Sequence, residues 1–302
     1  MTKFKNKTLT AKNEPRAFVG LKSLKTLWFN TGTQCNLACG NCYIESSPQN
    51  DRLIYLTQND ITPFLAELTP DTDLIAFTGG EPFINPNMIS LLESSLETGR
   101  DVLVLTNAFN ILKRHHNSLL SLKESYHHKL HLRISLDHHT KIVHEKERGV
   151  NTFDKTLVEI KWLFDNGFNI SIAGRSLSEE SMADSKQQYS VLLIKNNVNI
   201  NLHEKLVIFP EMISGEDVPE ISTACWDILS KSPDDQMCAS ERMIVRRKGS
   251  EAAVVLPCTL LAYDREFELG DTLESSEKDV YLNHEFCAKF CVLGGASCSS
   301  TT

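Results

Sequence analysis

The sequence predicts an α/β fold: an open, partial (β/α)6 TIM-like barrel followed by a small cysteine-rich α+β extension. Short runs of β-branched and aromatic residues alternate with segments of helical periodicity, as in parallel βαβ units. There are six such runs, fewer than the eight strands of a closed barrel. The alternation stops near residue 215, and six of the nine cysteines follow that point. We therefore expect two units of different construction.

The predicted strands are short and apolar, as expected of strands buried on both faces. They cover residues 26–30, 74–78, 102–106, 130–136, 169–173 and 206–209. Between them, helical periodicity predicts helices over residues 56–68, 86–97, 152–166 and 185–196. Asn151 and Thr152 are typical of a helix N-cap, and Gly167 is typical of a helix end.

The chain divides into three predicted segments. Residues 1–23 form an N-terminal arm, residues 24–215 form the partial barrel, and residues 216–302 form the extension. A unit of about 80 residues rarely has a core large enough to stabilise it alone. Because the extension carries so many cysteines, we expect metal binding to organise it.

Composition narrows the class of protein. The chain has 302 residues, 41% of them hydrophobic and 23% charged, which is ordinary for a globular protein. The net charge is −8, with no block of five like charges, which argues against a nucleic-acid partner. The N-terminus lacks the apolar core of a secretory signal, and no apolar stretch reaches the roughly 18 residues that span a bilayer. We therefore expect a cytoplasmic protein without membrane contact, in which clustered thiols are metal ligands and not disulfides.

The most informative motif is CNLACGNC, which holds Cys35, Cys39 and Cys42. Three thiolates leave one iron of a four-iron cluster open to another ligand. Two alternatives stay open at this point. Structural zinc sites also use closely spaced cysteines, but they close all four coordination positions. The thiols could also be buried without any metal.

Polar residues stand where each predicted strand ends. In a parallel array these ends meet on one rim, where ligands bind. Each residue alone has an ordinary explanation as a tight turn, a cap or a surface charge. Together with the cysteine loop, they suggest one site built from Gly79, Gly80, Glu81, Pro82, Thr106, Asn107, Ser135, Asp137, Arg175 and Glu211.

These motifs, in this order, resemble the radical S-adenosylmethionine (SAM) superfamily over about residues 24–212. The resemblance implies that Cys35, Cys39 and Cys42 hold a [4Fe–4S] cluster whose open iron chelates the amino and carboxylate groups of SAM. Residues 79–82 match the turn that binds the methionine amine, for which the Glu81 carboxylate could offset the ammonium. Thr106, Asn107, Ser135 and Asp137 suit the ribose hydroxyls or the SAM carboxylate. Arg175 suits that carboxylate through its guanidinium fork.

One position departs from the family pattern. The family usually has an aromatic residue just before the third cysteine, near the adenine, and this chain has Asn41 there. Tyr43, one place after the third cysteine, is expected to cover part of that role.

The extension contains a second group of cysteines. Cys238 and Cys258 flank a predicted β-hairpin that turns at residues 248–249, and Cys287 and Cys291 would share one face of a helix. This arrangement resembles the twitch and SPASM extensions of radical SAM enzymes. It implies one auxiliary Fe–S cluster, a [4Fe–4S] cluster, with zinc as the alternative. The ligands would come from Cys238, Cys258, Cys287, Cys291 and Cys298, while Cys225 is interpreted as a core residue.

The resemblance implies an enzyme that cleaves SAM reductively and abstracts hydrogen from a substrate, with electrons from a flavodoxin- or ferredoxin-type donor. Few residues precede the first strand, so a small polar metabolite is preferred over a peptide, which stays the alternative. A non-catalytic Fe–S or zinc sensor is a hypothesis of a different class. His138, His139 and His144 follow the fourth strand and could close over the substrate, although such loops are commonly solvated.

Overall fold

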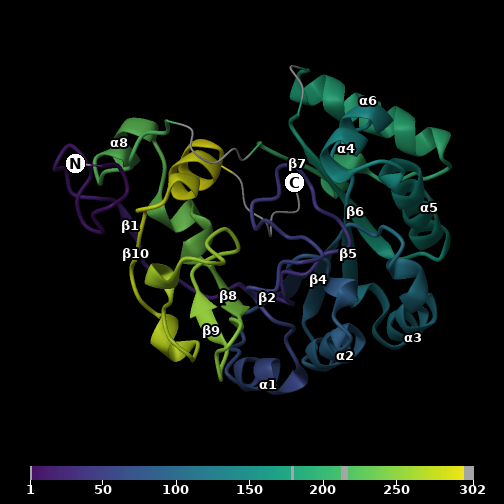
Figure 1. The fold of residues 1–302 in the computed structure, drawn as a ribbon, viewed down its shortest axis with the longest axis horizontal. Helices are drawn as coiled ribbons and strands as arrows, with labels where there is room; N and C mark the ends of the chain where they lie inside the picture. Colours follow the sequence, from purple (N-terminus) through teal and green to yellow (C-terminus); the bar gives the residue numbers. More distant parts are fainter. Residues whose placement is uncertain (1, 178–179, 212–216, 296–302) are drawn as a thin grey trace.

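In the computed structural model, which describes residues 2–177, 180–211 and 217–295, the barrel strands belong to one eight-stranded sheet ordered β7-β6-β5-β4-β3-β2-β8-β9 (Figure 1). The six barrel strands are parallel to their neighbours, which confirms the predicted partial barrel. Each lies where the sequence predicts it, with ends that agree or differ by one or two residues. They are β2 (Thr26–Asn30), β3 (Leu74–Thr78), β4 (Asp101–Thr106), β5 (Leu130–Ser135), β6 (Asn169–Arg175) and β7 (Leu206–Phe209).

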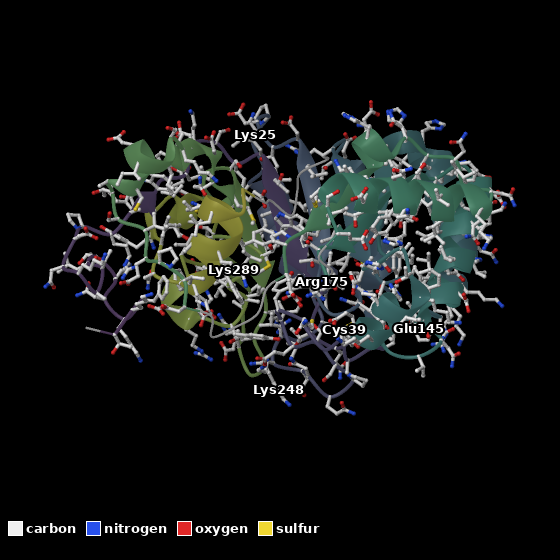
Figure 2. The ribbon with its side chains drawn as sticks, turned by 90° about the horizontal axis from the view of Figure 1, so that it is seen from above. Lys25, Cys39, Glu145, Arg175, Lys248 and Lys289 are labelled. Carbon is white, nitrogen blue, oxygen red and sulfur yellow. The ribbon has the colours of Figure 1, made fainter. Side chains whose placement is uncertain are left out.

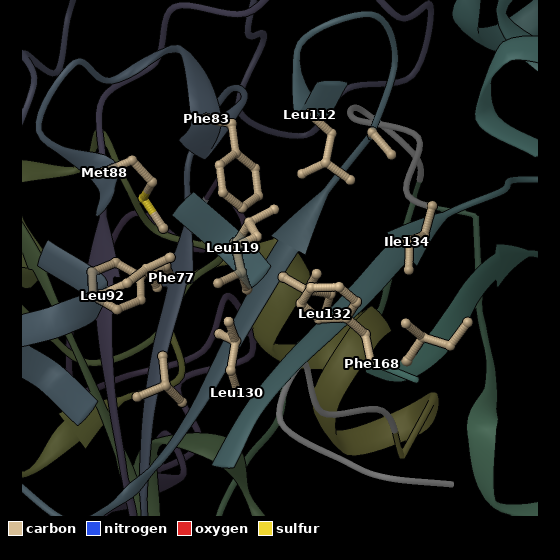
Figure 3. Close-up of a cluster of buried hydrophobic side chains, with 14 of the residues drawn as sticks. Phe77, Phe83, Met88, Leu92, Leu112, Leu119, Leu130, Leu132, Ile134 and Phe168 are labelled. Atoms are coloured by element: carbon tan, nitrogen blue, oxygen red, sulfur yellow. The ribbon is translucent and has the colours of Figure 1, made fainter. Parts of the chain in front are cut away.

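Helices cover the outer face of these strands, and the main core lies between the two layers (Figures 1 and 3). Phe77, Leu92 and Leu132 are among the side chains that this core buries completely. Each predicted helix is present, and α3, α4 and α7 are additional. The helices are α1 (Gln58–Ala66), α2 (Met88–Glu97), α3 (His116–Tyr126), α4 (Lys141–Arg148), α5 (Thr152–Asp165), α6 (Met182–Lys195) and the short α7 (Leu202–Lys205).

The predicted N-cap position of α5 is confirmed, although the Asn151 side chain does not form the cap. Asn151 precedes the helix in a left-handed conformation, with φ of +62°, and its side chain makes no capping hydrogen bond. Thr152 instead donates its hydroxyl to the carbonyl of Gly149 at 2.6 Å. Gly167 follows the helix end with φ of +65°, as a C-terminal glycine does.

The predicted hairpin is present and widens the barrel sheet. β8 (Glu241–Val245) pairs with β2 in parallel, and β9 (Val254–Leu256) returns antiparallel to β8. The extension thus shares a sheet with the barrel, and the boundary at residue 215 stays a prediction. The extension also holds α8 (Cys225–Leu229), β10 (Val280–Tyr281) and a π-helix, η8 (Cys287–Leu293).

The N-terminal arm packs on the extension. β1 (Phe18–Val19) pairs antiparallel with β10. The guanidinium of Arg16 is buried and donates to the carbonyls of Asn6, Leu9 and Leu282 and to the carboxylate of Glu220. The first residues of the chain are therefore tied to its last third. Among the described helices, none is long and apolar enough to cross a membrane.

Candidate active site and a second cysteine site

One cavity opens at the carboxyl ends of the barrel strands and gathers most of the predicted site. Figure 2 shows two of its residues, Cys39 and Arg175, near the middle of the molecule, between the teal helices and the yellow-green extension. All three cysteines of the first motif line the cavity. The other predicted residues along its wall are Tyr43, Gly79, Gly80, Thr106, Asn107, Ser135, Asp137 and Arg175.

The cysteine loop surrounds its sulfurs with hydrogen-bond donors. The backbone N–H of Leu37 points at Cys35 Sγ at 3.4 Å, and that of Ser46 at Cys42 Sγ at 3.3 Å. Asn107 Nδ2 lies 3.6 Å from Cys35 Sγ. Burial raises the pKa of the Cys35 thiol to about 12, with a further contribution from the charge of Glu81. A thiolate here therefore needs a positive partner, and the donors around the sulfurs suit a metal-bound thiolate.

The Gly79–Gly80 turn is held against the loop that carries Cys35. The N–H of Gly80 donates to the carbonyl of Gly32 at 2.8 Å, and the N–H of Glu81 to that of Gln34 at 3.1 Å. A Cβ atom at residue 80 would lie 2.1 Å from the carbonyl oxygen of Gln34. Gly79 has φ of +138°, which strains any residue with a side chain. Both glycines are therefore required for the approach of the two loops.

The expectation that the Glu81 carboxylate offsets the SAM ammonium is corrected by the structure. This carboxylate faces into the protein and accepts hydrogen bonds from Phe83 N, Thr106 Oγ1 and Asn107 N at 2.8–3.1 Å. Burial raises the pKa of Glu81 to about 7, and these hydrogen bonds, which lower it, offset only part of that effect. Neither Glu81 nor Pro82 lines the cavity, since Pro82 starts a buried 3-10 turn. Glu81 thus fixes the rim of β4 and leaves the cavity wall to backbone atoms.

A group of charged side chains forms the wall beside Cys39. Arg148, at the end of α4, holds both oxygens of Asp137 at 2.7 and 2.8 Å. Burial alone would raise the pKa of Asp137, but the charge of Arg148 outweighs it and lowers that pKa. Arg175 Nη1 lies 3.5 Å from Glu147 Oε2, and the carbonyl of Glu147 accepts from the N–H of Gly40. Helix α4, which sequence reasoning missed, therefore joins the cysteine loop to two of the predicted residues.

The position that departs from the family pattern has a partner. Asn41 Nδ2 donates to Glu211 Oε1 at 2.8 Å, which links the cysteine loop to the end of β7. Tyr43 and Asn41 both line the cavity, and the role of Tyr43 beside the adenine stays a prediction.

The histidines after β5 are not the solvated loop that such sequences commonly form. His138 is 2% exposed and His144 is 0% exposed. His138 and His139 both contact the carboxylate of Glu180. Burial, followed by the charge of Arg148, lowers the pKa of His144 to about 4, so this side chain is neutral near pH 7. None of the three lines the cavity.

The second cysteine group also gathers around one small cavity. Cys238, Cys258, Cys287 and Cys291 line it together with apolar neighbours. Burial raises the pKa of Cys238 and of Cys287 to about 12. Cys225 is half-buried, packs beside this core and lies 3.6 Å from Ser222 Oγ. Cys298, the fifth predicted ligand, lies outside the described residues.

The spacing of the sulfurs bears on which metal centre would fit. Tetrahedral zinc with bonds of about 2.3 Å brings its sulfurs within about 3.8 Å of one another. Among the described residues, only His138, His139 and Glu180 place three candidate ligand atoms within 4.8 Å of each other. Neither cysteine group is that compact. The sulfurs of neither group are thus preassembled for tetrahedral zinc, and sets of thiolates are the ligands that hold iron–sulfur clusters.

Two apolar side chains of the extension connect the cavities. Leu260, two residues after Cys258, lines both of them. Phe290 lies between Cys287 and Cys291 on η8, lines the first cavity, and stacks on Phe209 with ring centroids 6.0 Å apart. Phe209 ends β7, at the far edge of the open barrel from β8. The sequence did not single out these residues, because apolar side chains near cysteines cannot be distinguished from ordinary core residues by sequence alone.

The sequence matches a known family in the region that builds the first cavity. Residues 29–184, more than half of the chain, match the profile of the Radical SAM superfamily. The chain belongs to this superfamily. The cofactors that follow from membership are a [4Fe–4S] cluster and SAM, and the donors around Cys35, Cys39 and Cys42 fit such a cluster.

Two curated relatives of this radical SAM protein differ in what they make. The antilisterial bacteriocin subtilosin biosynthesis protein AlbA of Bacillus subtilis (strain 168) is 33% identical over 157 residues, which cover 51% of this chain and 33% of AlbA. The GTP 3′,8-cyclase of Haemophilus influenzae (strain PittEE) is 27% identical over 169 residues, which cover 54% of this chain and 48% of the cyclase. The match thus spans less than half the length of either relative.

Solved structures extend the likeness in fold. Streptococcus suis SuiB bound to S-adenosylmethionine aligns with a TM-score of 0.61 and 16% identity, over 91% of this chain and 68% of SuiB. Native anSMEcpe with bound AdoMet aligns with a TM-score of 0.60 and 17% identity, over 86% of this chain and 82% of anSMEcpe. At such identities the likeness concerns the fold alone. It reaches well beyond residues 29–184 into the cysteine-rich extension.

Proposed function

We propose that this protein is a radical SAM enzyme that oxidises an apolar side chain of a peptide, with an auxiliary [4Fe–4S] cluster that takes the electron left on the substrate. The first cluster, when bound, supplies the electron that cleaves SAM to methionine and the 5′-deoxyadenosyl radical, which takes a hydrogen atom from the substrate. A flavodoxin- or ferredoxin-type protein would provide that electron.

The residues of the first cavity have distinct roles in this proposal. Cys35, Cys39 and Cys42 hold the cluster, and the backbone of Gly79 and Gly80 accepts the methionine amine. Thr106, Asn107 and Ser135 would bind the ribose hydroxyls or the carboxylate of SAM. Arg175 carries a cation at the cavity wall that suits the SAM carboxylate. Asp137 positions Arg148 and the wall, since its carboxylate is already held by two hydrogen bonds.

The observation that carries the proposal is the shared wall between the two cysteine-lined cavities. Leu260 borders both, and the helix of Cys287 and Cys291 places Phe290 in the first one. A substrate carbon beside Phe290 would lie between the radical and the second cluster. That is the position from which an electron can pass to an acceptor after hydrogen abstraction.

The same cavity supports an apolar reacting group. Beyond its polar rim it is lined by Leu105, Phe209, Leu260 and Phe290, which offer no partner to a charged or heavily hydroxylated metabolite. SuiB bound to precursor peptide SuiA shares this fold, and AlbA acts in bacteriocin biosynthesis. A peptide is therefore preferred here over the small polar metabolite that the sequence suggested. A small polar metabolite is the second candidate substrate, because the relatives also include GTP cyclases.

The first experiment tests the chemistry without a known substrate. After anaerobic reconstitution we expect about eight irons per chain, and about four in the triple alanine variant at Cys35, Cys39 and Cys42. Reduced wild-type protein should form 5′-deoxyadenosine from SAM, and the triple variant should not. A protein that binds iron but leaves the electron paramagnetic resonance signal unchanged when SAM is added would be a sensor or scaffold instead.

The second experiment tests the substrate class. Cells of the source organism grown in deuterated medium give a peptide fraction and a small-metabolite fraction, each added to reduced enzyme with unlabelled SAM. Carbon-bound deuterium should appear in 5′-deoxyadenosine with the peptide fraction, as measured by mass spectrometry. Transfer from the metabolite fraction alone would overturn the peptide assignment and leave the radical chemistry intact.

A further inference from the structure

Two arginines, one in the N-terminal arm and one in the extension, are buried to nearly the same degree, yet their charges are compensated differently. Arg16 is 1% exposed and Arg242 is 0% exposed. Arg16 forms an ion pair with Glu220. The hydrogen bonds of Arg242 all end on backbone carbonyls. Its Nη1 donates to Cys238 O and Glu241 O at 2.7 Å each, and its Nε and Nη2 donate to Ser276 O at 3.2 and 3.0 Å.

No carboxylate of the described residues forms a hydrogen bond or an ion pair with Arg242. The carboxylate of the neighbouring Glu241 accepts from Trp28 Nε1 at 2.7 Å, and Glu277 is exposed to solvent. Burial lowers the pKa of Arg242 to about 10, while the charges of Cys238, Cys258 and, last, the exposed Glu277 act in the opposite direction. A guanidinium in this position is costly unless an anion lies close by.

The place of Arg242 in the fold indicates where that anion would be. Its strand, β8, has β2 on one side and β9 on the other, and all five of its residues are buried. Arg242 bonds directly to the backbone of Cys238, and β9 leads to Cys258. These two cysteines and the pair on η8 line the second cavity. Four thiolates around an oxidised [4Fe–4S] core form a dianion, so the second site would place negative charge beside Arg242, which already bonds to the backbone of Cys238.

We propose that Arg242 is the buried counter-charge of an anionic cluster held by Cys238, Cys258, Cys287 and Cys291, and that it sets the reduction potential of this cluster. The inference rests on the auxiliary cluster of the proposed function. Reduction adds a further negative charge, which a fixed guanidinium stabilises. Arg242 therefore makes the cluster a better electron acceptor, as a substrate radical requires. It is a positioning residue, since it acts through the cluster and its ligands.

The test uses the full chain with Cys35, Cys39 and Cys42 replaced by alanine, so that any iron signal comes from the second site. In this background, Arg242→Gln keeps amide donors for the carbonyls but loses the charge, and Arg242→Lys keeps the charge. Arg246→Met is the matched control, because Arg246 follows the same strand and already pairs with Asp60 at 2.9 Å. The measurements are the potential from a redox titration followed by electron paramagnetic resonance, and the rate of iron loss to a chelator.

We expect Arg242→Gln to shift the potential to more negative values and to lose iron about tenfold faster, as changes beside metal ligands commonly do. Arg242→Lys should keep most of the potential, and Arg246→Met all of it. Without metal, Arg242→Gln should be at least as stable as its parent, because it removes an uncompensated charge. The same potential in Arg242→Gln and in Arg246→Met, or a metal-free Arg242→Gln protein that fails to fold, would overturn the role of Arg242. A background protein that holds zinc, or no iron, would refute the auxiliary cluster itself.

Discussion

The two cysteine-lined cavities are built in opposite ways. The first has three cysteines on one loop, a polar rim contributed by four strands, and a wall of paired charges. The second has four cysteines from separated elements and an otherwise mainly apolar lining. The buried Arg242, which has no carboxylate partner among the described residues, donates to the backbone of one of these cysteines, Cys238. One is arranged to bind a cofactor and a substrate, and the other to enclose a complete set of metal ligands.

The two cavities therefore depend on different contacts in the fold. The first cavity needs close contact between loops at the strand ends, as the Gly79–Gly80 turn against residues 32–34 shows. The second needs distant segments to be brought together, including the N-terminal arm, whose Arg16 bonds to Glu220 and to Leu282. Changes in either set of contacts should therefore have separable effects.

The largest expected effect separates the two cavities directly. Replacing Cys39 by alanine removes one of the three ligands of the first cluster, and formation of 5′-deoxyadenosine should fall to background. Cys258→Ala should keep the cleavage of SAM without substrate, because it alters the second cavity only, while about four irons are lost. Chromatography of 5′-deoxyadenosine and iron analysis measure both. Loss of SAM cleavage in Cys258→Ala would mean that the two sites are not independent.

Much of the first site could be predicted because spacing carries its information. Strands with buried apolar runs end at fixed points, and a parallel sheet brings those ends together, so residues such as Asn107 and Arg175 were found. The direction of a side chain is not contained in spacing. Glu81 turns inward because its carboxylate can accept three hydrogen bonds there.

The second site was less predictable for a related reason. Four of its cysteines were named, but Leu260 and Phe290 resemble core residues until their cavity is known. Arg242 alternates with apolar neighbours, as a solvent-facing strand residue does. It is buried because β8 continues the barrel sheet, and that pairing joins segments more than two hundred residues apart, Leu27 and Arg242.

The second-largest expected effect concerns the ion pair between Arg16 of the N-terminal arm and Glu220 of the extension. Glu220→Gln leaves Arg16 without its anion, and breaking such a buried pair costs about 3 kcal/mol of unfolding free energy. Urea unfolding of metal-free protein near pH 7 measures this loss. Asp234→Asn is the control, because Asp234 pairs with Lys22 at the surface and its loss should leave the unfolding midpoint unchanged. Equal effects of the two substitutions would contradict the importance of the buried pair.

The same pair should respond to pH. Burial would raise the pKa of Glu220, but hydrogen bonds from Ala11 N, Phe4 N and Arg16 outweigh it and hold the pKa below 4.5. A carboxyl with a depressed pKa in the folded state stabilises the protein above its unfolded pKa, and this stability is lost as the pH falls through the folded value. The difference in unfolding free energy between wild type and Glu220→Gln should therefore shrink over the acid range, as the pH falls from about 5 through the folded pKa. A difference that stays constant over this range would exclude the ionised pair as its cause.

The smallest expected effect tests the close contact that shapes the first cavity. Gly80→Ala places a Cβ atom 2.1 Å from the carbonyl of Gln34, so the backbone must shift, at a cost of about 2 kcal/mol. Gly40→Ala, in the cysteine loop itself, is the matched control, because its Cβ would meet Glu147 Oε2 at an ordinary 3.7 Å. Unfolding of the metal-free proteins compares the two, and iron retention after reconstitution shows whether the shift reaches Cys35. If the two variants are equally stable and hold equal iron, the Gly79–Gly80 turn does not set the position of the cysteine loop.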